Sequence, residues 1–260
     1  RKARVSEHQG RAELKAKVNA RGTVLRAYIL KPFLLRDNDS VPKSHTHYME
    51  SLTIAEAFLD LGYDVDVIDY RNATFKPQKN YSFFVSARTN FTKIAPRLNN
   101  DCIKIAHLDT AHFLFNNATA FERLLEMQKR RGETAYSMKL IEKNWAPEHA
   151  DYLAVLGNEF TLSTYRYSGK KMFDLPVPTP SVYPSPADKN VDSARKRFIW
   201  LGSNGLVHKG LDLTLEAFSQ LPDHHLIVCG PVDDASEQEF KNIYSRELYE
   251  TSNIETIGWI

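Results

Sequence analysis

A glycine-rich turn at residues 202–210, with the sequence Gly-Ser-Asn-Gly-Leu-Val-His-Lys-Gly, holds the residue types best suited to chemistry. It lies between residues 197–201, which predict a strand, and residues 210–221, which predict a helix. Helix-start N–H groups and the helix dipole attract phosphate, and glycine lets backbone approach a ligand closely. A tight turn with a surface lysine has the same pattern. We expect an anion site formed by Gly202, Ser203, Asn204, Gly205, Lys209 and Gly210.

Two histidines lie where a strand is predicted to end. His107 ends the strand predicted at residues 103–107, and His112 lies in the loop that follows. Ligands of open α/β sheets bind at the carboxyl ends of strands, where histidine can hydrogen-bond a hydroxyl or a phosphate. A loop residue reaches a cleft more easily, so His112 is the predicted catalytic residue, with His107 the alternative. Asp109 could orient either ring or form a turn.

Two more histidines, His45 and His47, begin the helix predicted at residues 45–61. At a helix start their side chains could contact phosphate groups, so we assign both to the binding site. Polar residues are also common at helix starts without any ligand.

Several familiar sites are missing from the sequence. The dinucleotide fingerprint G-x-G-x-x-G is absent, and residues 31–44, after the first predicted strand, contain no glycine. There is no phosphate-binding G-x-x-x-x-G-K-[ST] sequence and no Cys/His spacing typical of zinc. We expect no metal site, and we expect Cys102 and Cys229 to be buried free thiols in a reducing compartment.

Strand-like and helix-like segments alternate along the chain, which predicts an α/β fold with parallel sheets. Glycines are placed to end the early helices, and a proline-rich stretch at residues 176–186 predicts a linker or crossover. Strands are predicted at 27–30, 65–68, 82–86, 103–107, 152–156, 197–201 and 226–229, and helices at 45–61, 120–131, 159–168 and 210–221.

This pattern divides the chain into two Rossmann-like domains, the second incomplete. We expect a basic extension at residues 1–26, a first domain at 27–180, a linker at 181–196 and the start of a second domain at 197–260. The chain does not begin with Met and stops just after a strand-like segment, so we expect a piece of a longer protein.

Charge is unevenly distributed. The formal net charge is +2, but residues 1–26 hold eight Lys and Arg against two Glu. Such a segment can contact anionic lipid or be a solvated extension. The basic residues at the end of the helix at 120–131 either interact with the negative end of the helix dipole or face a membrane surface.

No apolar run approaches the ~20 residues of a membrane span, and no secretory signal is visible. We expect a cytoplasmic protein, with peripheral contact at the inner face of the membrane left open, and no nucleic-acid partner.

Residues 197–260 resemble the start of the donor domain in GT-B glycosyltransferases of family four. That family shows a strand ending in Gly-Arg, six residues to Lys, then Gly and an amphipathic helix. An apolar strand ending in Gly and a later strand ending in Gly-x-[VI] follow, as at residues 226–230 and 254–260 here. The likeness is looser over 27–180, which resembles the acceptor domain. Ser203 replaces the family's arginine, and the E-x7-E carboxylate pair would lie beyond Ile260.

The resemblance implies a retaining, metal-independent transfer of a hexose from a nucleotide diphosphate sugar to a hydroxyl of a glycan or lipid-linked acceptor. It implies no cofactor besides this donor substrate. Lys209 and the amides of the turn would meet the diphosphate, while His112 would contact the sugar or assist proton movement. This chain alone should not be catalytically complete. The alternatives are a non-catalytic nucleotide-binding or interaction module of a larger polysaccharide-biosynthesis protein, and an epimerase of the same architecture.

Overall fold

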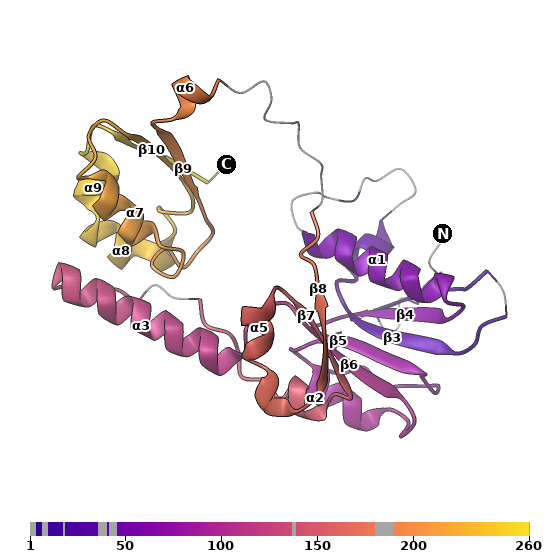
Figure 1. Cartoon of the computed structure of the whole chain (residues 1–260). Coiled ribbons are helices and arrows are strands. Elements are labelled where there is room, and N and C mark those ends of the chain that lie inside the picture. Colours follow the sequence, from indigo (N-terminus) through magenta and orange to yellow (C-terminus); the bar gives the residue numbers. More distant parts are fainter. Residues whose placement is uncertain are drawn as a thin grey trace. The chain divides into compact units, whose positions relative to one another are not determined.

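The computed structural model describes residues 4–6 (backbone only), 10–17, 19–35, 41, 46–136, 139–179 and 190–259. The chain forms two compact α/β units (Figure 1). Unit 1 contains the described residues of Arg1–His112 and Glu142–Tyr183, and unit 2 those of Phe113–Ile141 and Pro184–Ile260.

Unit 1 is built on a sheet whose described strands lie in the order β1-β2-β4-β3-β5-β6-β7-β8. From β4 to β8 neighbouring strands are parallel, whereas β2 is antiparallel to β4 and β1 to β2. The strands are β1 (Arg4–Ser6), β2 (Arg11–Leu14), β3 (Thr23–Tyr28), β4 (Asp64–Asp69), β5 (Phe83–Ala87), β6 (Ile103–Leu108), β7 (Tyr152–Leu156) and β8 (Lys171–Leu175).

Helices lie on both faces of this sheet (Figure 1). On one face, α1 (Thr46–Asp60) packs Ala55 and Leu59 into a cluster with Val24 and Val65. On the other, Phe91 and Ala146 belong to a cluster with strand residues such as Leu25 and Leu153. The remaining helical elements of unit 1 are η1 (Lys31–Leu34), α2 (Phe91–Ile94), η2 (Ala95–Arg97), α4 (Ala146–His149), α5 (Glu159–Ser163) and η3 (Arg166–Ser168).

The order of the strands makes β3 a point of reversal. From β3 the chain passes through α1 to β4 on one side, and β5 then pairs with the other side of β3. In open α/β sheets, ligands bind at the carboxyl ends of the strands beside such a reversal. The loops after β3, β5 and β6 therefore mark the ligand edge of unit 1.

The predicted basic extension at residues 1–26 is corrected by the structure. β2 pairs with β4, and its Ala12 and Leu14 are buried. The strand predicted at residues 27–30 instead spans Thr23–Tyr28, because Val24 and Leu25 also enter the core. Charged residues interrupt the alternation of apolar and polar side chains in these short strands. The hydrophobic pattern of the sequence therefore did not reveal them.

Unit 2 contains a three-stranded parallel sheet, ordered β11-β10-β9 within the described residues. Its elements are α3 (Phe113–Arg131), α6 (Val191–Ala194), β9 (Arg197–Leu201), α7 (Leu211–Phe218), β10 (His225–Cys229), η5 (Ala235–Glu237), α8 (Gln238–Ile243), α9 (Ser245–Tyr249) and β11 (Ile254–Gly258). Leu211 and Leu215 of α7 pack in one apolar cluster with Val228 of β10 and Phe240 of α8. The strand–helix–strand order of β9, α7 and β10 agrees with the sequence pattern.

The predicted domain of residues 27–180 is wrong for helix α3, which belongs to unit 2. The sequence places it inside the domain 27–180, but Leu124 and Met127 belong to the apolar core of unit 2. The helix also starts at Phe113 rather than residue 120. Of the predicted linker 181–196, residues 181–189 lie outside the described residues, and Val191–Ala194 forms α6.

The predicted α/β class is confirmed, as are several predicted boundaries. Gly62, Gly132 and Gly169 follow helical segments in the left-handed conformation that ends helices without strain in glycine. Cys102 and Cys229 are buried free thiols. Helices in the described ranges are all too short or too polar to cross a bilayer.

The place of β2 in the core predicts a large effect of Leu14→Ala. Removing a buried leucine side chain from a core typically costs about 2–5 kcal/mol, so the urea midpoint of unfolding should fall clearly. Lys17→Ala, at an exposed position of the same segment, should change stability by no more than about 0.5 kcal/mol. Equal midpoints for both variants would mean that residues 11–14 do not belong to the sheet.

Candidate functional site

The predicted anion turn of unit 2 joins the carboxyl end of β9 to the start of α7. Gly205 and Gly210 have φ values of 87° and 77°, which favour glycine over any residue with a side chain. Gly210 directly precedes α7, and Lys209 is exposed beside it. The structure therefore brings the predicted residues into one strand-to-helix turn.

Gly202 has a packing role in this turn. A Cβ atom at Gly202 would lie 2.5 Å from the ring of Trp200, and one at Gly230 would lie 2.6 Å from the same ring. The Trp200 indole thus covers both glycines, and its Nε1 donates a hydrogen bond to the carbonyl oxygen of Lys209 at 3.2 Å. The close neighbour of Gly202 is a side chain of this protein, whereas the sequence analysis expected a ligand there.

The N–H group of Gly205 already has an anionic partner. It donates a hydrogen bond to Oε1 of Glu237 at 2.5 Å, and Glu237 is only 2 % exposed. Beside it, Nδ2 of Asn204 donates to Oγ of Ser236 at 3.2 Å. A carboxylate of the chain itself occupies the position that the sequence analysis assigned to a ligand.

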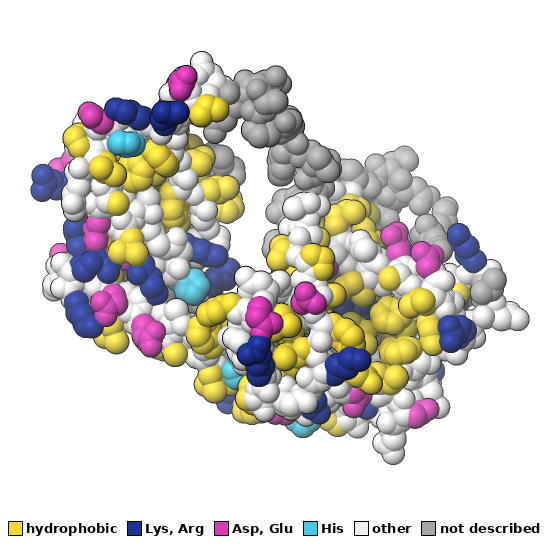
Figure 2. All heavy atoms as spheres, in the orientation of Figure 1, with side chains coloured by type: hydrophobic (Ala, Val, Ile, Leu, Met, Phe, Trp, Pro, Cys, Tyr) yellow, Lys and Arg dark blue, Asp and Glu magenta, His cyan; other side chains and the backbone are white. Residues whose placement is uncertain are grey.

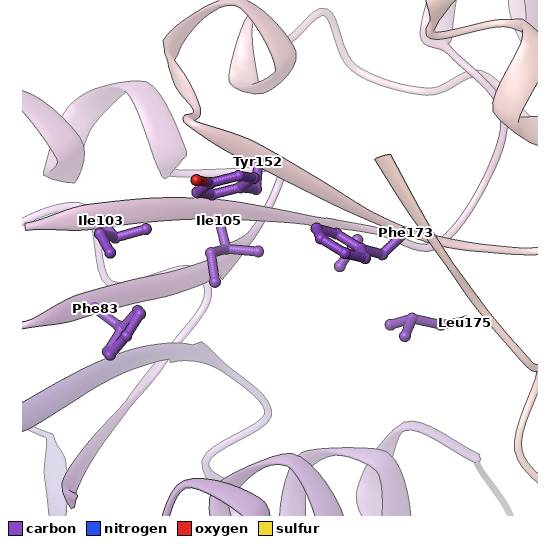
Figure 3. A pocket seen from close by; sticks show the side chains of 7 residues that line it. Phe83, Ile103, Ile105, Tyr152, Phe173 and Leu175 are labelled. Atoms are coloured by element: carbon purple, nitrogen blue, oxygen red, sulfur yellow. The ribbon is translucent and has the colours of Figure 1, made fainter. Parts of the chain in front are cut away.

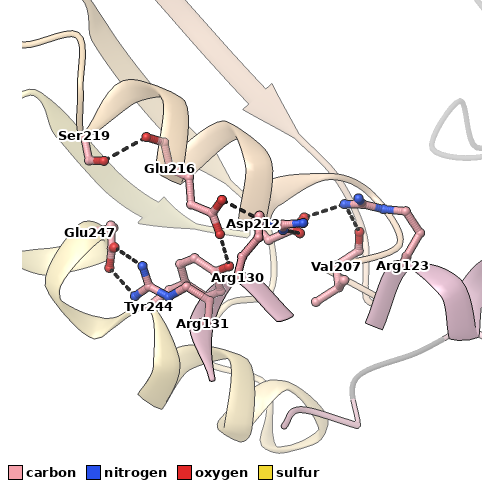
Figure 4. A network of polar contacts seen from close by, with 9 residues as sticks. All are labelled: Arg123, Arg130, Arg131, Val207, Asp212, Glu216, Ser219, Tyr244 and Glu247. Atoms are coloured by element: carbon pink, nitrogen blue, oxygen red, sulfur yellow. Dashed lines mark hydrogen bonds and ion pairs between the residues drawn. The ribbon is translucent and has the colours of Figure 1, made fainter. Parts of the chain in front are cut away.

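The first turn of α7 carries a second carboxylate. Asp212 is fully buried, and Arg123 and Arg130 of α3 bind its two oxygens at 2.7 and 2.5 Å (Figure 4). Burial raises the pKa of Asp212, although the two guanidinium groups oppose this. Nη2 of Arg123 also donates to the carbonyl oxygen of Val207 within the glycine-rich turn at 3.2 Å.

The basic end of α3 is therefore used inside unit 2. Arg130 also pairs with Glu216 at 2.8 Å, and Arg131 pairs with Glu247 at the same distance while lying 4.4 Å from the Tyr244 ring centroid (Figure 4). Arg130 and Arg131 thus have partners within unit 2, whereas Lys129 of the same helix end is exposed.

Positive charge nevertheless remains around the turn. Burial lowers the pKa of His208, and the nearby charges of Lys209, Lys139 and Arg123 lower it further. Lys139 and Lys209 are both exposed, and Cβ of Lys139 lies 3.2 Å from the position of a Cβ on Gly205. Nδ1 of His208 is buried and has no hydrogen-bond partner among the described residues. Two exposed cations, Lys139 and Lys209, thus lie beside the turn.

In unit 1, the predicted catalytic residue His112 is only 7 % exposed. Its Nε2 lies 3.1 Å from the hydroxyl oxygen of Tyr167, which donates its own proton to Oε1 of Glu148 at 2.8 Å. The backbone N–H of His112 donates to Oγ1 of Thr164 at 3.0 Å. Burial lowers the pKa of His112, so this chain of contacts holds a neutral imidazole that donates from Nε2.

The alternative, His107, belongs to a buried cluster at the ligand edge of unit 1. It is 1 % exposed, and its Nε2 contacts Oε1 of Glu50. Oε2 of the same carboxylate accepts the hydroxyl proton of Tyr28 at 3.2 Å. The Tyr28 ring lies 5.5 Å from the ring of His47, which thus joins this cluster. The other predicted histidine of α1, His45, lies outside the described residues.

A buried arginine completes this cluster. Arg26 of β3 is fully buried, its guanidinium lies 4.6 Å from the Tyr28 ring centroid, and none of its nitrogens has a hydrogen-bond partner in the part of the chain described. Burial lowers the pKa of Arg26 to about 10. Burial raises the pKa of Glu50, but His107 and Arg26 lower it more strongly, below its ordinary value. The positive charge of Arg26 thus acts on the Glu50 carboxylate, although no ion pair joins the two side chains in the part of the chain described.

Sequence reasoning missed most of the ligand edge of unit 1. Besides Arg26 and Glu50, it did not identify Arg88, which follows β5 and pairs with Asp109 after β6. Asp109 therefore pairs with an arginine, whereas the sequence left open whether it orients a histidine or forms a turn. One feature of the sequence could have identified Arg26: it is a charged residue within the mostly apolar strand Thr23–Tyr28.

An apolar pocket lies on the sheet face of unit 1 that carries α1 elsewhere. Its volume is about 470 Å³. Side chains from β5 to β8 line it (Figure 3), and hydrophobic side chains reach the surface of this unit in the space-filling view (Figure 2). The lining residues are Phe83, Ile103, Ile105, Tyr152, Ala154, Phe173 and Leu175.

Comparison with known proteins adds no assignment. No family model matches the chain, and no curated protein matches it. Within the described ranges, no group of three or more His, Cys, Asp and Glu side chains is arranged to hold a metal ion.

The buried position of Glu50 among Arg26, His107 and Tyr28 predicts that Glu50→Ala strongly destabilises the protein. It leaves the buried charge of Arg26 without the nearby carboxylate, and removing one of two opposite buried charges typically costs about 3–5 kcal/mol. Glu56→Ala, at an exposed position of the same helix, should change stability by no more than about 0.5 kcal/mol in urea unfolding.

A double variant separates charge from packing in this cluster. Arg26→Met removes the buried cation, so Glu50→Ala combined with Arg26→Met should recover part of the stability lost by Glu50→Ala alone. Losses that simply add in the double variant would show that Arg26 and Glu50 do not interact.

Proposed function

We propose that this chain is part of a GT-B-type glycosyltransferase that transfers a hexose, with retention, from a nucleotide diphosphate sugar to a hydroxyl of a glycan or lipid-linked acceptor. Unit 2 would bind the donor and unit 1 the acceptor. The observation that carries this proposal is the glycine-rich turn between β9 and α7, with exposed Lys139 and Lys209 beside it. The buried free thiols suit a protein of the reducing cytoplasm.

Three features of the turn support a diphosphate site. It follows a parallel strand at its carboxyl end, where ligands of α/β sheets bind. Lys139 and Lys209 are exposed beside it, and Arg123 reaches the carbonyl oxygen of Val207 within it. Negative charge develops on the leaving diphosphate during transfer, and preorganised cations and N–H groups lower the barrier by meeting that charge.

A second candidate is a nucleotide-binding module without transferase activity. Two observations favour it. Ser203 stands where the resembling family has arginine, and the Gly205 N–H is bound by Glu237 in place of a ligand. Both candidates require nucleotide binding at the same turn, and they differ in whether the sugar is transferred.

Calorimetric titration of the chain with UDP and GDP tests both candidates. We expect one of the two to bind, and we expect Lys209→Ala to weaken binding about tenfold, the effect of losing one charge-assisted contact of ~1.4 kcal/mol. The matched control is Lys196→Ala, at the opposite end of β9, which should bind as the parent chain does.

The outcomes separate the candidates. Failure to bind either nucleotide would contradict both, and equal loss in the two lysine variants would remove Lys209 from the site. If a nucleotide binds, incubation with the matching nucleotide sugars and analysis of the released products distinguish transfer from binding alone.

A further inference from the structure

Glu237 is held in the glycine-rich turn by a short surface segment. It ends η5, in which Ala235 and Ser236 are exposed while Glu237 is buried. Oδ1 of Asp234 accepts from the N–H and the hydroxyl of Ser236, and Ser236 in turn contacts Asn204. The segment therefore carries one carboxylate from an exposed position into the site.

The N–H that Glu237 occupies differs from its neighbours in the turn. The amide of Lys209 donates to the carbonyl oxygen of Gly205, that of Gly210 to Val207 and that of Leu211 to Leu206, so the turn uses all three amides itself. The amide of Gly202 donates to Cys229. The Gly205 N–H instead donates to a carboxylate oxygen, Oε1 of Glu237, so its hydrogen bond is charge-assisted.

Cationic side chains lie around the turn that this carboxylate enters. The positive charges of Lys139, Lys209 and Arg123 all act on His208, which is itself part of the turn. The same field would stabilise a phosphate group. A phosphate and the Glu237 carboxylate cannot both accept from the Gly205 N–H, and their like charges repel at contact distance.

We propose that Glu237 is a displaceable internal anion and the specificity-determining residue of this turn: its carboxylate occupies the oxyanion position at the Gly205 N–H until a phosphate group of the ligand replaces it. Once the carboxylate has left, only an anionic ligand group can replace both its hydrogen bond to the Gly205 N–H and its negative charge beside the surrounding cations. The ligand class is therefore an organic or inorganic diphosphate, and a neutral sugar alone does not bind. The inference deepens the proposed function and rests on it for the identity of the natural ligand.

Pyrophosphate is the probe, with calorimetry for affinity and ¹⁵N NMR for the Gly205 amide. In the parent chain, pyrophosphate should bind and shift the Gly205 signal. Glu237→Gln keeps a side chain of the same shape but removes the competing charge, so it should bind pyrophosphate about tenfold more tightly. Glu250→Gln, at an exposed position after α9, should bind as the parent chain does.

A charge-preserving variant guards against a folding artefact. Glu237→Asp retains the competing carboxylate, so its affinity should stay close to that of the parent chain while Glu237→Gln gains. A gain in Glu237→Asp as large as that in Glu237→Gln, equal affinity of Glu237→Gln and the parent, or binding that leaves the Gly205 signal unmoved would each overturn the displaceable anion. If neither the parent nor Glu237→Gln binds pyrophosphate, the proposed function itself is overturned along with it.

Discussion

Unit 2 depends on a carboxylate that is removed from water. Asp212 has no exposed surface, and an ion in that position needs counter-charges close by, since its desolvation costs several kcal/mol. Arg123 and Arg130 supply them from α3, more than 80 residues earlier in the chain. Leu124 and Met127, on the same helix, then complete the apolar core. One buried charge thus fixes which helix belongs to the unit and where it packs.

The same constraint organises unit 1. Asp66 is nearly inaccessible and accepts hydrogen bonds from Tyr81 at 2.8 Å and Lys79 at 3.1 Å, with Arg11 within 3.5 Å. Arg11 belongs to β2, which pairs with the strand of Asp66, and the charge of Arg26 acts on Glu50 in the buried cluster around His107. The positive charges near the start of the chain, which resemble a free basic tail in the sequence, are in part counter-charges of the folded domain.

The candidate site shows how far local sequence can go. Strand, glycine-rich turn and helix at residues 197–221 follow from hydrophobic pattern and glycine placement, and the structure places them as predicted. The occupant of the Gly205 N–H could not be predicted, because Glu237 comes from the segment after the next strand. In unit 1, both His107 and His112 are held by residues distant in sequence, Glu50 and Tyr167. A local pattern cannot contain such partners.

The sequence by itself determined the α/β class, the positions of most strands and the glycines that end helices, because these depend on side-chain periodicity and on backbone conformations that few other residues adopt. Tertiary structure decided the membership of α3 in unit 2, the inclusion of β2 in the sheet and the internal anion at Gly205. Each of these depends on a buried charge or hydrogen-bonding group finding a partner far away in the chain. That pairing is a property of the folded molecule, since only burial makes an unpaired charge costly.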